Sequence, residues 1–88
     1  MPTREEILAS GQELVIQLQA AIRSDQEFIN LIQQTLARFK AQGSPYIAEV
    51  EAQLQAAHKI QHDRQALLGK LVQQRTAAIE AFERYRDL

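Results

Sequence analysis

The chain has 88 residues, ten basic and eleven acidic side chains, 45% apolar residues and no cysteine. Disulfides and thiolate metal sites are therefore excluded, and the balanced charge leaves no net field to attract a phosphate backbone or an anionic membrane surface. A single short domain buries a small share of its surface, so self-association is a common route to stability.

The first predicted helix begins after Thr3. The Thr-Arg-Glu-Glu run over 3–6 matches a capping box, in which the Thr3 hydroxyl accepts a hydrogen bond from the Glu6 backbone N–H. Residues rich in Ala, Leu, Gln and Glu follow without proline, which predicts a helix over 4–42. The start is acidic and no apolar run approaches the roughly 20 residues that cross a bilayer, so we expect a cytoplasmic protein without membrane contact.

Apolar residues of this helix recur every seven positions, which is typical of coiled-coil helices that pack side by side with a gentle supercoil. One row, the aliphatic row, consists of Leu8, Val15, Ile22, Ile29 and Leu36. A second row consists of Ile7, Leu14, Ala21, Phe28 and Thr35. A third row consists of Gly11, Leu18, Asp25, Ile32 and Phe39. Three adjacent rows make a side that is wider than a single neighbouring helix covers.

A Gly-Ser-Pro run at 43–45 interrupts the pattern near the middle of the chain. Glycine readily takes the left-handed conformation that ends a helix, serine caps the start of the next helix, and proline fits its first turn. A turn at 43–44 and a second helix over 45–87 are therefore predicted. Residues 1–88 then form a single all-α domain, an antiparallel helical hairpin of two long helices.

Folding the second helix back places two residues opposite each other when their position numbers add up to about 89. Ile32 then faces Ala57, and Asp25, the only charge on the apolar stripe of the first helix, faces Arg64. We interpret Asp25 and Arg64 as an ion pair that fixes the register, because a misaligned packing would leave a partly buried charge unpaired. A ligand or metal site at the waist of the hairpin is the alternative.

Chemically reactive clusters are not evident. His58 and His62 are four residues apart, a spacing that can present two imidazoles to one metal, but no Glu or Cys stands at ligand spacing. The serines have no histidine and acid at matching helical positions, and there is no glycine-rich phosphate cradle. We therefore expect no enzyme activity, no cofactor and no metal.

The aliphatic row is expected to remain uncovered by the hairpin, because the other two rows are assigned to the contact with the second helix. Burying each of its five side chains contributes roughly 1.5 to 3 kcal/mol. Covering the row with a second copy would convert two hairpins into a four-helix bundle, so the row is the predicted homodimer interface. Contacts on the flanks of the second helix are expected from Ile60, Leu67, Val72 and Ile79.

The favoured function is a protein–protein interaction module that self-associates, as an adaptor, small regulator, inhibitor or chaperone would. One alternative is a subunit of an obligate heteromer, in which a different chain covers the aliphatic row. Another is an RNA-binding hairpin dimer, but the basic residues do not share one continuous face and acids interleave them, which argues against nucleic acid. An arm-swapped dimer with an open turn is also compatible with the pattern.

Overall fold

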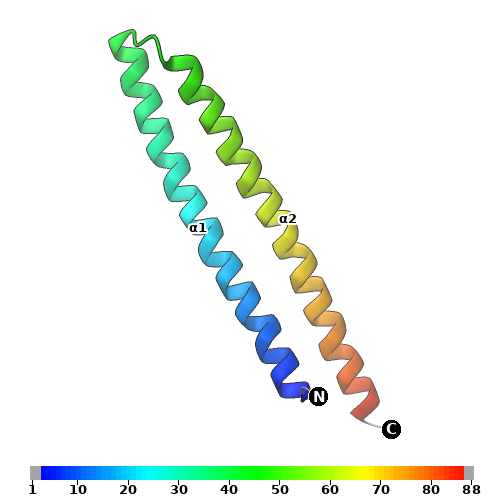
Figure 1. Cartoon of the computed structure of the whole chain (residues 1–88). Helices are drawn as coiled ribbons and strands as arrows, with labels where there is room; N and C mark the ends of the chain where they lie inside the picture. The colour runs from blue at the N-terminus through cyan, green and yellow to red at the C-terminus, as the bar shows by residue number, and fades with distance from the viewer. Residues whose placement is uncertain (1–2, 87–88) are drawn as a thin grey trace.

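The computed structural model describes residues 3–86 as two long helices joined by a short turn (Figure 1). Helix α1 spans Arg4–Gln42 and helix α2 spans Ile47–Arg86. The two helices run antiparallel and side by side along a rod of 69 × 18 × 15 Å. The turn lies at one end of the rod, and the start of α1 and the end of α2 lie at the other end. The predicted all-α hairpin is confirmed.

Both ends of α1 are capped as the sequence predicts. The Thr3 hydroxyl accepts a hydrogen bond from the Glu6 backbone N–H at 3.2 Å. At the other end Gly43 takes the left-handed conformation, with φ 65° and ψ 34°. The backbone N–H groups of Gly43 and Ser44 then donate to the carbonyls of Lys40 and Phe39, at 3.3 and 3.0 Å. These bonds satisfy carbonyls that the helix itself leaves without partners.

Substituting Gly43 by Ala is expected to lower the free energy of unfolding by about 1 kcal/mol, because a side chain is strained at positive φ. No atom within 4 Å would obstruct the added Cβ, so the cost comes from the backbone conformation alone. Gly69→Ala is the matched control, since Gly69 lies inside α2 with equally open surroundings. That control is expected to gain up to about 1 kcal/mol. Urea denaturation at one protein concentration compares the two variants. If both variants changed the free energy of unfolding in the same direction, the left-handed conformation of Gly43 would be contradicted.

The start of α2 differs from the prediction. The turn extends over 43–46, and the helix begins at Ile47 instead of position 45. The Ser44 hydroxyl accepts from the Tyr46 backbone N–H at 3.2 Å, and this local bond closes a turn before the helix can start. The Tyr46 carbonyl is the first acceptor, bound by the Val50 N–H at 3.2 Å. The predicted helix end at position 87 lies outside the described residues.

The core of the hairpin is small and lies in the half of the rod nearest the turn. Its buried members are Ile29, Ile32, Leu36, Val50 and Ala57. Phe39, Ile47 and Leu54 are partly buried and pack against them. In the half of the rod farther from the turn, the residues between the helices, such as Leu18 and Leu71, are only partly buried. A single hairpin therefore encloses few apolar side chains.

The aliphatic row lies between the two helices, so the prediction that the hairpin leaves it uncovered is wrong. Ile29 and Leu36 are buried in the core, and the other three members, Leu8, Val15 and Ile22, are partly buried. The uncovered row is the adjacent one, in which Ile7, Leu14 and Phe28 are exposed. An uninterrupted aliphatic row fills a helix seam better than one that contains Ala and Thr, and burying it removes more apolar area from water.

Candidate interaction face

One long side of the hairpin is apolar, and we call it the apolar face. It is defined by six exposed side chains, namely Ile7, Leu14, Phe28 and Leu31 of α1 and Ile60 and Leu67 of α2. All six line open grooves between the helices. Exposed apolar residues that share one side of a small protein usually mark an interaction site. This face is therefore the candidate functional site.

Two of the grooves lie in the turn half of the hairpin and share Phe28 and Gln53 in their walls. The larger one, of about 220 Å³, is lined by Phe28 and Ile60 and also by Asp25. The other, of about 180 Å³, has Leu31 in its wall. Together they form a shallow trough lined mainly by apolar side chains.

Two further grooves continue the same face towards the open end of the rod. They share Leu14 and Leu71 in their walls and have volumes of about 220 and 230 Å³. One of them places Ala21 of α1 beside Leu67 of α2. Because residues 14, 21 and 28 are seven apart, the four grooves follow one side of the supercoiled pair. The apolar face thus extends over most of the length of the rod.

The opposite side of α1 is polar. Its exposed row consists of Gln12, Gln19, Gln26, Gln33 and Lys40. Gln26 donates to Asn30 at 2.9 Å and accepts from Gln61 of α2 at 3.0 Å. Lys40 lies 3.8 Å from the Glu51 carboxylate. The hairpin is therefore two-sided, with apolar grooves on one side and mainly polar side chains on the other, where Ile16 and Val72 are exposed apolar exceptions.

The Asp25–Arg64 contact that the register predicts is present. The Arg64 guanidinium donates to Oδ1 of Asp25, and the two side chains are 40% and 14% exposed. The second oxygen of Asp25 is buried without a hydrogen-bond partner. The acid is thus the more deeply placed member, and its charge depends on Arg64 for compensation. The role of this pair in fixing the register stays a prediction.

Arginines fill the seam towards the open end. The Cδ atom of Arg75 lies where it would be 3.9 Å from a Cβ added at Gly11, so its methylenes occupy space that this glycine leaves open. The Arg75 Nε atom is buried without a partner. Arg4 places its guanidinium 5.6 Å from the centre of the Phe82 ring, within the range of a cation–π contact. Both arginines thus contact the other helix near the open end of the rod.

The other chemical candidates are not brought together. His58 and His62 are both exposed on α2. Within the part of the chain that the structure describes, no three side chains of His, Cys, Asp or Glu form a group that could hold a metal ion. Over residues 3–86, neither helix has a stretch long and apolar enough to cross a bilayer.

The sequence pattern predicts the wrong row of α1 as the exposed row, but it correctly predicts part of the apolar face on α2. Ile60 and Leu67 were expected on the flank of the second helix, and both are exposed on the apolar face. The missed residues are Ile7, Leu14 and Phe28, which occupy the second row of the seven-residue repeat, and Leu31, which lies in none of the three rows. The interruptions of that row by Ala21 and Thr35 are the signal that could have placed it outside the seam.

Comparison with known proteins identifies no relative. No protein-family model matches the chain, and no curated protein or solved structure shows significant similarity to it.

Proposed function

We propose that this protein is a non-enzymatic protein–protein interaction module, a helical hairpin that associates with a second copy of itself through the apolar face. The observation that carries the proposal is the division of the hairpin into one apolar and one polar side. Over residues 3–86 the two-helix rod has five buried apolar side chains, so it has little core of its own. Packing two such rods face to face produces a four-helix bundle with a continuous core.

The energetic gain from covering the apolar face is large relative to the stability of a small domain. Its six side chains are each about half exposed. Completing the burial of each would contribute roughly 1 kcal/mol, so the two copies together gain on the order of 10 kcal/mol before the entropy of association is subtracted. Native domains are stable by only about 5 to 15 kcal/mol, so a gain of this size is sufficient to determine whether the protein is a monomer or a dimer.

The bundle would present its polar surfaces to other proteins. The glutamine row of α1 would remain outside, with its amide groups available as donors and acceptors. A rigid rod that displays such groups at seven-residue intervals suits an adaptor, a small regulator, an inhibitor or a chaperone.

Leu14→Glu is expected to abolish self-association, whereas Ile16→Glu is expected to leave it intact. The two side chains are matched, because they are 53% and 54% exposed on the same helix and differ in the side of the hairpin they occupy. A glutamate at position 14 would bring a charge into the apolar contact between the copies. Light scattering should give twice the chain mass of 10.0 kDa for the wild type and Ile16→Glu, and the single-chain mass for Leu14→Glu.

A wild-type protein that is a stable monomer at micromolar concentration would refute self-association. In that case a different chain, as in a heteromer, would be the remaining candidate partner for the apolar face. Circular dichroism of both variants shows whether each remains helical, so that loss of association is separated from loss of folding.

A further inference from the structure

We propose that the second copy lies antiparallel across the apolar face, with α2 against α2 of the copy and the two turns at opposite ends of the bundle. This inference rests on the proposed self-association and specifies how the two copies meet. It assigns the contact to a charged row of α2 that borders the apolar face.

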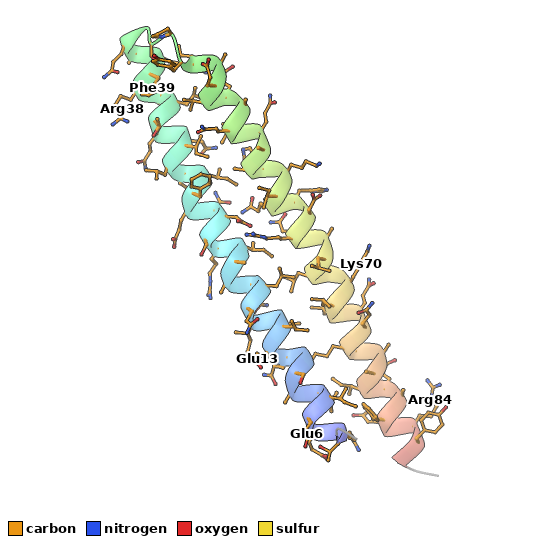
Figure 2. The ribbon with its side chains drawn as sticks, viewed as in Figure 1. Glu6, Glu13, Arg38, Phe39, Lys70 and Arg84 are labelled. Carbon is orange, nitrogen blue, oxygen red and sulfur yellow. The ribbon has the colours of Figure 1, made fainter. Side chains whose placement is uncertain are left out.

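The bordering row carries charges that complement each other when the helix is reversed. It consists of Glu49, Ala56, Asp63, Lys70, Ala77 and Arg84, and all six residues are exposed. Figure 2 shows the side chains of Lys70 and Arg84 directed away from α1, where they are free to meet another chain. The first half of the row is acidic and the second half is basic, with an alanine at the middle of each half. An antiparallel second copy therefore pairs Asp63 with Lys70 and Glu49 with Arg84, each of them twice.

Both charge pairs require the same position of the twofold axis. Asp63 and Lys70 have their midpoint between residues 66 and 67, and so do Glu49 and Arg84. Leu67, a half-exposed member of the apolar face, lies at that point and would contact its own copy. A closed dimer needs one axis for all of its contacts, and this agreement satisfies the requirement on α2.

The same twofold axis also brings apolar residues of the two α1 helices into contact. Ala21 lies beside Leu67 across a shared groove, so the two residues are at the same level of the rod. Leu14 and Phe28 each lie seven residues from Ala21, and rotation about the axis places Leu14 of one copy against Phe28 of the other. Ala21 meets its own copy at the axis, where a small side chain lets the two α1 helices approach closely.

The other face-to-face arrangement, with both turns at the same end, has weaker charge complementarity. It would place α1 against α2 of the copy, so that residues at equal levels of the rod meet. Arg38 would then pair with Glu49, but Asp63 and Lys70 would face the uncharged Ser24 and Gln17. Opposed turns give two kinds of ion pair and parallel turns give one, which favours opposed turns.

The available area is sufficient for a stable dimer. The rod is 69 Å long and at least 15 Å wide, so one of its long sides measures about 1,000 Å² in projection. A standard protein interface buries about 800 Å² on each partner. The charged row would form the polar rim of this interface, and the apolar face would form its centre.

Charge reversal tests the antiparallel contact of α2 with its copy. Asp63→Lys alone and Lys70→Asp alone should each raise the dimer dissociation constant about 10-fold, because each change replaces two attractive contacts by two repulsive ones. An equimolar mixture of the two variants should recover an affinity within about 3-fold of the wild type, since every lysine then faces an aspartate. Glu13→Lys, on the outer side of α1 (Figure 2), is the control and should leave the dissociation constant unchanged.

Disulfide formation across the axis provides the second readout, since the natural chain has no cysteine. Leu67→Cys should give a covalent dimer under mild oxidation. Val72→Cys, with a similar exposure of 45% against 48% but a position off the apolar face, should not. A dimer with parallel turns would instead link Leu67→Cys protein to Ala21→Cys protein.

The outcomes separate this inference from the proposed function. A dimer in which the mixture of charge variants shows no recovery and Leu67→Cys does not link to itself would overturn the antiparallel arrangement and leave self-association standing. A wild-type monomer would overturn both. Recovery in the mixture together with the Leu67→Cys dimer would establish the arrangement.

Discussion

Ile29→Ala is expected to lower the free energy of unfolding by about 3 kcal/mol, within the range of 2 to 5 measured for such deletions in protein cores. Ile29 is the most deeply buried side chain of the hairpin, with 1% of its surface exposed. Removing three of its carbon atoms would leave a void between α1 and α2 where two helices alone cannot close the gap. Urea denaturation at a fixed protein concentration measures the change, because a dimer's stability depends on concentration.

Ile16→Ala is the matched control for that substitution. It deletes the same atoms from the same helix, but Ile16 is 54% exposed. Alanine also has the higher helix propensity, so the expected change is within about 0.5 kcal/mol of zero. A loss at Ile29 no larger than the loss at Ile16 would show that the aliphatic row does not form the core in solution.

Breaking the Asp25–Arg64 pair is expected to cost more than removing both charges. Arg64→Leu should lower the free energy of unfolding by about 1 to 2 kcal/mol, because Asp25 is mostly enclosed and would lose its one partner among residues 3–86. The estimate is kept low because Arg64 is 40% exposed and water screens part of the interaction. The double variant Asp25→Leu with Arg64→Leu should equal or exceed the wild type, since two leucines complete the apolar seam.

The double variant also tests whether the pair fixes the register. Without the charges, neighbouring alignments of α1 and α2 leave no unpaired group, so more than one packing becomes accessible. Amide NMR spectra should then show broadened or doubled signals from the middle of both helices, while the wild type shows one set. A sharp single set in a stable double variant would mean that the apolar rows alone determine the register.

The parts of the fold that depend on local chemistry are predictable from the sequence. The Thr3 cap and the left-handed Gly43 follow from side-chain and backbone properties of single residues, and the structure contains both. The register of the two helices was also predictable, because the alignment that matches the apolar rows places Asp25 opposite Arg64, and the two side chains are in contact. The start of α2 was not, since the Ser44 hydroxyl can cap either a helix or a local turn, and the choice depends on bonds that form after folding.

The exposed row of α1 could not be determined from spacing. The rows that begin at Ile7 and Leu8 are both three or four residues from members of the third row, so either can share a seam with it. Their spacing in the sequence is identical, and the choice depends on the rotation of α1 against α2. The deciding difference is the total apolar area that each rotation buries, to which the uninterrupted aliphatic row contributes most.

The concentration of buried residues beside the turn implies an order of assembly. Leu36 and Val50 are separated by fourteen positions, and joining them closes a short loop at small entropic cost. The distal tips are separated by most of the chain and have only partly enclosed side chains between them. The hairpin should therefore fold from the turn outwards, and the helix ends farthest from the turn should unfold first.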